Sequence, residues 1–237
     1  MRIPIEVPSY QDHRSQCRIV ATTPQKEPVL WKQFLDGAQE SYMRHGVTTA
    51  LEMPTIRDGS TTALFFAALD NSGAMLGGVR VQGPYSSVDQ SHALVEFAGY
   101  PNGLRHVHHM LDERIEHGVV ELKSAWVAPN APRGRAVTAM IAESPAYSTA
   151  LLGARYALAT AASHVRTAWL DTGAIIATQI EPIPYPDERY RTEVFWWDRR
   201  TLAFDAELAT WRRMRRNTAS LLAHRRAAVE LPEAVAS

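Results

Sequence analysis

The stretch VVELKSAWVAPNAPRGRA, residues 119 to 136, constrains the fold of this 237-residue chain more than any other. It begins as an apolar strand that contains one acid, Glu121, and it runs directly into a turn with two arginines around one glycine. The small residues that follow predict a helix. A strand, a glycine-containing turn and a helix in this order can cradle a phosphate, because the N–H groups and dipole of the first helical turn attract an anion. The alternative is a solvated basic turn before a surface helix.

The composition is that of an ordinary globular protein, with 46% hydrophobic and 21% charged residues. Lys+Arg and Asp+Glu both number 25, so no global charge attracts nucleic acid or an anionic membrane. The one cysteine, Cys17, excludes an internal disulfide and favours a reducing compartment. The first residues lack the apolar core of a signal peptide, and no run approaches the ~18 apolar residues of a membrane span. We therefore expect a cytoplasmic protein without a membrane span.

The pattern of apolar residues predicts one mixed α/β domain over residues 1–204 and a basic helical tail over residues 205–237. Two of the predicted strands form a hairpin around the turn NSG. Gly77 and Gly78 in its second strand predict a bulge or a close approach of two backbones. The predicted helices cover 29–45, 101–117, 136–153 with a break at Ser144-Pro145, 163–173 and 205–228. The predicted strands lie near Ile19 and over 63–70, 74–83, 118–127, 154–161, 174–186 and 190–198.

This order of elements resembles that of the GNAT acyltransferase superfamily. The superfamily carries Gln/Arg-x-x-Gly-x-Gly/Ala in a turn that holds the pyrophosphate of coenzyme A. Here the frame is Ala131-Pro132-Arg133-Gly134-Arg135-Ala136, which matches at the glycine and at the final alanine and has alanine in the first position. The resemblance implies a mixed, mostly antiparallel central sheet flanked by helices. It also implies that the donor is bound by Arg133, Gly134, Arg135 and Ala136 in the turn and by Ala125, Trp126 and Val127 in the strand.

A second landmark of the superfamily is an aromatic residue four positions before a glycine. Trp169 and Gly173 have this spacing. The superfamily often has tyrosine there as the general acid, and the indole of tryptophan cannot supply a proton. Trp169 is therefore expected in the substrate pocket, and another acid is needed.

Within the superfamily, residues 28 to 200 resemble long-chain N-acyl amino acid synthases and acyl-homoserine lactone synthases most. Those proteins have a Gly-x-x-Arg strand and a later strand with a glutamate. GGVRV supplies Arg80, VVELKSAWV supplies Glu121, and SYMRHGV ends the first helix in a similar way. The resemblance implies transfer of an acyl group from acyl-CoA or an acyl carrier protein to an amine, for which an amino acid is one candidate. It implies no cofactor beyond that donor.

Acyl transfer to an amine needs a base for the ammonium, a polarised thioester carbonyl and an acid for the thiolate. Glu121 is the first candidate base, because a carboxylate in an apolar strand is well suited to taking up a proton. The alternatives are a glutamate on the solvent face, or one paired with Arg80 or Lys123 for structure. Three roles are open for Arg80. It orients Glu121, it binds a substrate carboxylate, or it lies on the surface. His164 is a second candidate base.

The aromatic segment PIPYPDERYRTEVFWWD, residues 182 to 198, has the composition of an acceptor or acyl-chain pocket. Tyr185 or Tyr190 can replace the missing acid, and Arg189 is a candidate substrate ligand. The alternative is that these aromatic residues close the core of a strand pair.

Two other patterns suggest other functions. The histidines of RHVHH, residues 105 to 109, lack the spacing of a zinc site, so we expect no metal. The tail WRRMRRNTASLLAHRR has six arginines and no acid, which predicts a solvated helix face or a docking surface for an acidic carrier protein. Two rival functions remain, an acyl-thioester-binding or regulatory protein without turnover, and a nucleic-acid-binding protein that uses this tail.

Overall fold

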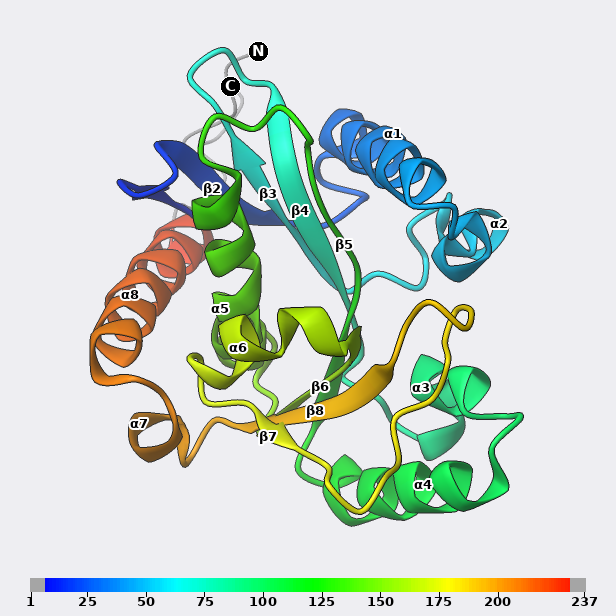
Figure 1. Ribbon diagram of the computed structural model, residues 1–237. Coiled ribbons are helices and arrows are strands. Elements are labelled where there is room, and N and C mark those ends of the chain that lie inside the picture. The colour runs from blue at the N-terminus through cyan, green and yellow to red at the C-terminus, as the bar shows by residue number, and fades with distance from the viewer. Residues whose placement is uncertain (1–6, 231–237) are drawn as a thin grey trace, which may run out of the picture.

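The computed structural model describes residues 7–230, whose strands form one eight-stranded sheet in the order β1-β2-β3-β4-β5-β6-β8-β7 (Figure 1). Neighbouring strands are antiparallel except for β5 and β6, which are parallel. The predicted mixed, mostly antiparallel sheet is confirmed. The strands are β1 Ser9–Asp12, β2 Cys17–Thr22, β3 Leu64–Leu69, β4 Met75–Gln82, β5 Val119–Val127, β6 Tyr156–Ala162, β7 Ile175–Ile176 and β8 Thr192–Asp198.

Helices cover both faces of the sheet (Figure 1). One face carries α1 Pro28–Arg44, α2 Met53–Ile56, α3 His92–Glu96 and α4 Pro101–Ile115. The other carries α5 Gly134–Leu152, α6 Arg166–Leu170 and α8 Leu208–Glu230, and α7 Leu202–Asp205 precedes α8. Short 3₁₀ turns lie at η1 Thr48–Leu51, η2 Val88–Gln90 and η3 Ser163–Val165. Within residues 7–230, no helix combines the length and the apolar character that a membrane span requires.

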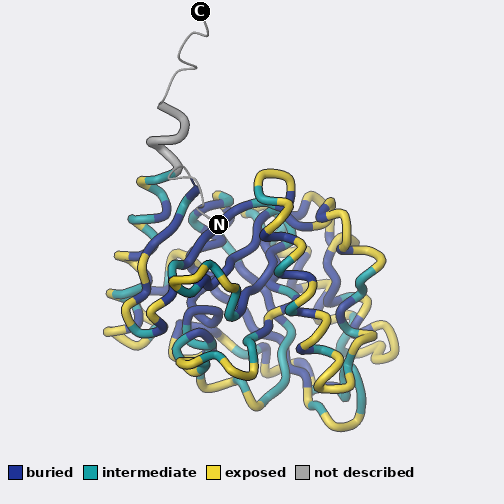
Figure 2. The backbone as a smooth tube through the Cα atoms, turned by 90° about the horizontal axis from the view of Figure 1, so that it is seen from above, coloured by how far each residue is buried: buried dark blue, intermediate teal, exposed yellow. Residues whose placement is uncertain are grey.

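The predicted hairpin forms the centre of the sheet. Every residue of β3 is buried, because α1 covers one of its faces and α5 the other. Gly78 in β4 allows the close approach that the sequence predicted, since a Cβ there would lie 2.5 Å from the carbonyl oxygen of Phe66 and 3.0 Å from the ring of Phe34. The register also shifts between Gly78 and Arg80. Figure 2 shows the buried backbone in the interior and the exposed segments around it.

Two predicted elements are wrong. α5 is continuous through Pro145, and the hydroxyl of Ser144 donates a hydrogen bond of 2.6 Å to the carbonyl of Ile141. In a regular helix the carbonyl of Ile141 would accept a hydrogen bond from the N–H of residue 145. Proline has no N–H, so the hydroxyl of Ser144 replaces that bond. The strand expected over 174–186 is reduced to the two residues of β7 and a bridge between Ile183 and Thr192. The prolines at 182, 184 and 186 lack the N–H groups that a longer ladder needs.

The C-terminal helix α8 packs against α5 and β1, so the described part of the predicted tail shares the main hydrophobic core. Met214 and Leu221 are fully buried. Arg213 was expected on a solvated face, but its guanidinium donates a hydrogen bond of 2.7 Å to the buried carboxylate of Glu143. Residues 231–237 of that tail lie outside the described residues.

The close approach at Gly78 gives the first prediction. Gly78→Ala places a methyl group against a backbone carbonyl in the middle of the sheet, so the free energy of unfolding should fall by about 1–3 kcal/mol, as in other overpacked cores. Urea denaturation measures this. Gly99→Ala is the matched control, because a Cβ there meets nothing within 4 Å. Equal stabilities of the two variants would contradict the assigned packing.

Candidate functional site

The site begins where β5 and β6 separate. Residues 119–122 of β5 pair with residues 156–159 of β6, and beyond that point β5 pairs only with β4 while β6 pairs only with β8. Ser124, which has a positive φ of 53°, lies just past the last pair and bulges the strand. Residues 123–127 of β5 therefore present an edge without a neighbouring strand on the side of β6.

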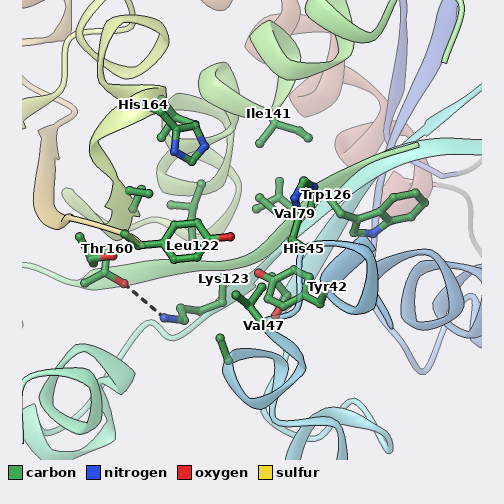
Figure 3. Close-up of a pocket in the computed structure, with 18 of the residues that line it drawn as sticks. Tyr42, His45, Val47, Val79, Leu122, Lys123, Trp126, Ile141, Thr160 and His164 are labelled. Carbon is green, nitrogen blue, oxygen red and sulfur yellow. Dashed lines mark hydrogen bonds between the residues drawn. The ribbon is translucent and has the colours of Figure 1, made fainter. Parts of the chain in front are cut away.

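A cavity of about 460 Å³ fills this gap and reaches both faces of the sheet. In Figure 3, His164 and Ile141 lie above the strands, and Lys123, Tyr42 and Val47 lie below them. An apolar arm faces α5 and α6, and its lining includes Val79, Leu122, Ile141, Ala142, Val165, Ala168 and Trp169. A polar arm faces α1 and α3, and its lining includes Tyr42, His45, Glu96, Lys123, Thr160, Tyr185 and Tyr190.

The outer end of the gap carries the residues that the sequence assigned to the donor. Ala125, Trp126 and Val127 all line the cavity. The turn that follows leads to Gly134, the first residue of α5. Arg133 and Arg135 are exposed, and Arg133 donates one hydrogen bond of 3.2 Å to the carbonyl of Arg14. Ala136 is half-buried in the first turn of α5. Residues 131–136 are not part of the cavity lining, but the turn adjoins it at Val127, whose Cγ1 would lie 3.8 Å from a Cβ at Gly134.

A buried ion pair lies at the inner end of the polar arm. The ammonium of Lys123 contacts Glu96 Oε1 and also lies 3.3 Å from the hydroxyl of Thr160. His92 contacts the same Glu96 oxygen through Nδ1 at 3.0 Å, and its Nε2 lies 2.8 Å from Glu52. Burial disfavours the charged form of Glu96, but Lys123 and His92 outweigh it and lower its pKa to about 2. Burial alone would lower the pKa of Lys123, and Glu96 and Glu121 reverse this effect.

Glu121 lies beside this pair and outside the cavity lining. It is fully buried, and its Oε2 accepts hydrogen bonds from Tyr85 Oη at 2.8 Å, Ser91 Oγ at 2.8 Å and the backbone N–H of His92 at 3.0 Å. Its Oε1 lies 3.8 Å from Lys123 Nζ. Glu121 thus anchors the segment that leads into α3, and Lys123 separates it from the polar arm.

Arg80 is buried on the same face of the sheet. Its Nε donates a hydrogen bond of 3.1 Å to the hydroxyl of Ser124, which lines the cavity. Its Nη1 has no hydrogen-bond partner among residues 7–230. The surface alternative for Arg80 is therefore wrong, because only 1% of the residue is exposed.

The segment 185–190 closes one side of the polar arm. Tyr185 and Tyr190 both line the cavity, whereas Arg189 is not part of its lining. Arg189 forms a bidentate ion pair with Asp187. It also donates a hydrogen bond of 3.2 Å to the carbonyl of Gly46, which connects this segment to the end of α1. Burial and the nearby Glu96 raise the pKa of Tyr185 to about 12, so its hydroxyl carries a proton at neutral pH.

Trp169 and His164 lie on the opposite side of the sheet. Trp169 is buried and packs against Phe195 and Trp197, with ring centroids 6.0 Å and 4.8 Å away. It also lines the apolar arm. His164 is exposed in η3 and lines the cavity. Of the aromatic residues that the sequence grouped together, the two tyrosines line the cavity, and Phe195 and Trp197 close the core.

Sequence reasoning missed Glu96, His92 and Tyr42. The interval 84–100 received no predicted element, because α3 is only five residues long. One signal was present, since His92 and Glu96 are four positions apart and face one side of a helix. Tyr42 lies in the predicted first helix, where its spacing indicated only a core position.

The fold is that of the GNAT-like acyltransferases, which confirms the predicted resemblance. The N-acyl amino acid synthase FeeM from uncultured soil microbes aligns over 82% of this chain and 98% of its own, with a TM-score of 0.53 and 12% identity. The CoA-dependent acyl-homoserine lactone synthase BjaI, solved with SAM and isopentyl-CoA, aligns over 84% and 88%, with a TM-score of 0.53 and 15% identity. MesI, another CoA-dependent acyl-homoserine lactone synthase, aligns over 83% and 95%, with a TM-score of 0.53 and 14% identity.

Within this fold, the chain belongs to the family of two mycobacterial proteins. They are Uncharacterized protein Rv1356c of Mycobacterium tuberculosis (strain ATCC 25618 / H37Rv) and Uncharacterized protein Mb1391c of Mycobacterium bovis (strain ATCC BAA-935 / AF2122/97). Each is 48% identical over 193 residues, which cover 81% of this chain and 73% of the relative. No family model matches the chain.

The buried ion pair predicts the stability of one variant. Glu96→Gln leaves the Lys123 ammonium buried, with Glu121 3.8 Å away as its remaining carboxylate contact. The free energy of unfolding at pH 7 should fall by about 3 kcal/mol, as when other buried pairs lose one partner. Urea denaturation measures this, and Glu113→Gln on the exposed surface of α4 is the control. A loss no larger than that of the control would contradict the pairing.

The same carboxylate predicts a pH dependence. The pKa of Glu96 is about 2 in the folded protein and 4.5 ordinarily, so its ionisation contributes stability that is fully present above pH 4.5. That contribution is lost as the pH falls from 4.5 towards about 2. Unfolding followed from pH 6 to about pH 2 should show a shallower acid loss for Glu96→Gln than for the wild type. Parallel curves would show that Glu96 does not carry this dependence.

Proposed function

We propose that this chain is an N-acyltransferase, which moves an acyl group from acyl-CoA or an acyl carrier protein to an amine. The parting of β5 from β6 is the observation that carries the proposal. It opens a cavity through the sheet, with an apolar arm on one face and a polar arm on the other, and the cationic start of α5 adjoins the cavity-lining Val127. An acyl thioester has a matching arrangement of parts, with an anionic end, a linear arm and an apolar chain.

The donor would lie along the free edge of β5. Its phosphates would meet the first turn of α5, where Gly134 lets the backbone approach and Arg133 and Arg135 add charge. The thioester would then lie beside residues 125–127, whose edge faces the gap. This placement brings the reacting carbon to the junction of the two arms.

The acyl chain would occupy the apolar arm. Leu122 and Ile141 line this arm, and Trp169 lies on its wall. Because Trp169 is held by Phe195 and Trp197, it is a fixed wall for the chain and not a proton donor. The amine would occupy the polar arm, on the other face of the sheet.

In the transfer step, the amine nitrogen forms a bond to the thioester carbon and the carbon–sulfur bond breaks. The leaving thiolate takes a proton, and Tyr185, which lines the cavity, is the first candidate donor. Tyr190 is the second candidate. The proton that the ammonium loses goes to a base, for which Glu121 and His164 are the candidates. His164 lines the cavity, whereas Glu121 lies outside the lining and would act across Lys123.

The cationic turn gives a binding prediction. Arg133→Ala together with Arg135→Ala should weaken the binding of coenzyme A by at least ~1.5 kcal/mol, about tenfold, because charge-assisted hydrogen bonds to phosphate are lost. Isothermal titration calorimetry measures this. Arg199→Ala together with Arg200→Ala removes the same charge from exposed residues after β8 and should leave binding unchanged. Unchanged affinity in the first double variant would remove this turn from the donor site.

Glu121→Gln tests the base. The change keeps shape and hydrogen-bonding reach but removes basicity, so acyl transfer should fall by about a hundredfold or more. The rise of the wild-type rate with pH should also disappear. Free thiol released from an acyl-CoA in the presence of an amine measures turnover.

Glu143→Gln is the control, since Glu143 is fully buried in α5 but bound by Arg14, Arg213 and Tyr147. Wild-type turnover with an unchanged pH profile in Glu121→Gln would reject Glu121 as the base and leave His164 and the segment 185–190 as candidates.

A further inference from the structure

We infer that the amine acceptor carries a second ammonium group, which binds Glu96 at the inner end of the polar arm while the other nitrogen is acylated. The inference rests on the proposed function and names its acceptor class, a compound with two basic nitrogens. Two sources share this chemistry, a simple diamine and a basic amino acid.

One carboxylate oxygen of Glu96 has no hydrogen-bond partner among residues 7–230. Its Oε1 is occupied by Lys123 and His92, whereas its buried Oε2 has no hydrogen-bond partner among residues 7–230. Glu96 itself lines the cavity, and only 6% of the residue is exposed. An unpaired carboxylate oxygen at a buried cavity wall is costly unless a donor from a ligand reaches it.

The surroundings favour a cation at this point. Tyr42 and Tyr185 line the same arm, and burial together with the charge of Glu96 keeps the hydroxyls of both protonated, with pKa values of about 12. Glu96 contacts Lys123 and His92, His92 also contacts Glu52, Glu121 lies 3.8 Å from Lys123, and the charge of Arg80 interacts with Glu52 and Glu121. A carboxylate between two tyrosines is a favourable setting for an ammonium.

Glu96 is also held in place for this role. Nδ1 of His92 contacts Oε1 at 3.0 Å, and Nε2 of His92 lies 2.8 Å from Glu52. Glu52 has a positive φ of 52°, a conformation that L-residues seldom adopt. A contact between Glu52 and His92 fixes the ring, and the ring fixes the carboxylate.

The nitrogen bound at Glu96 is not the nucleophile. Lys123 and His92 lower the pKa of Glu96 to about 2, so this carboxylate is a weak base and stabilises the charged form of any ammonium that it binds. The nucleophile must instead be neutral, and it must reach the thioester beside residues 125–127. Ala125 follows Lys123 by two residues in β5, with the bulge at Ser124 between them, so the two positions lie at most roughly 7 Å apart. An extended chain of four carbons between two nitrogens spans a similar length.

The wild-type protein tests this with matched acceptors. In calorimetric titrations, 1,4-diaminobutane should bind at least about tenfold more tightly than butylamine or 4-amino-1-butanol, the effect of one charge-assisted hydrogen bond. Ornithine and norvaline form the second matched pair. Tighter binding of ornithine than of 1,4-diaminobutane identifies a basic amino acid as the source, and the reverse order identifies a simple diamine. Equal binding of the diamine, the monoamine and the amino alcohol, with no preference for ornithine over norvaline, overturns the inference.

Variants assign the preference to Glu96. The double variant Glu96→Gln with Lys123→Met removes both charges of the pair, so it avoids the buried lone cation of the single variant. It should lose the preference for two basic nitrogens, whereas Glu113→Gln should keep it. A preference that persists in the folded double variant overturns the assignment to Glu96.

The two hypotheses fail separately. No thiol release from acyl-CoA with any amine would refute the proposed function, while the binding preference would still decide the inference. Thiol release with equal kcat/KM for diamines and monoamines would refute the inference and leave the proposed function standing.

Discussion

Strands β5 and β6 run parallel for four residue pairs and then separate, and the rest of the site depends on that separation. A sheet whose strands stayed paired would offer two closed faces. Here the gap joins the two faces, so one cavity has an apolar arm under α5 and α6 and a polar arm under α1 and α3. The bulge at Ser124 directs β5 away from β6 and carries it to the cationic turn. In the proposed function, this path of the backbone sets the order of the phosphate, thioester and acceptor positions.

The second constraint is electrostatic. Lys123 and Glu96 are both buried at the inner end of the gap, and neither charge is tolerable there without the other. Glu121, Ser91 and Tyr85 fix the segment that leads into α3, so the placement of Glu96 depends on a carboxylate from the central strand. A buried network of this kind gives little net stability, since desolvation offsets attraction. We regard it as retained for the position in which it holds the cavity carboxylate.

Elements with strong local signals were predictable from the sequence. The 119–136 stretch, the central hairpin and α1 follow from apolar spacing and turn chemistry, and the order of elements indicated the superfamily. The prediction failed where tertiary context decides. β1 is four residues long and α3 five, so neither shows a periodicity, and Pro145 is accommodated within α5. The sequence pointed to Glu121 for its isolation in an apolar strand. Which carboxylate reaches the cavity depends on the pairing of distant segments, and Glu96 was therefore missed.

The central claim is that the gap between β5 and β6 holds an acyl thioester. A crystal structure of the protein with coenzyme A tests it most directly. The account predicts that the pyrophosphate lies against the N–H groups at the start of α5, beside Arg133 and Arg135, and that the pantetheine arm lies between residues 125–127 of β5 and residues 160–162 of β6. Coenzyme A bound at another surface, with this gap empty, would contradict it.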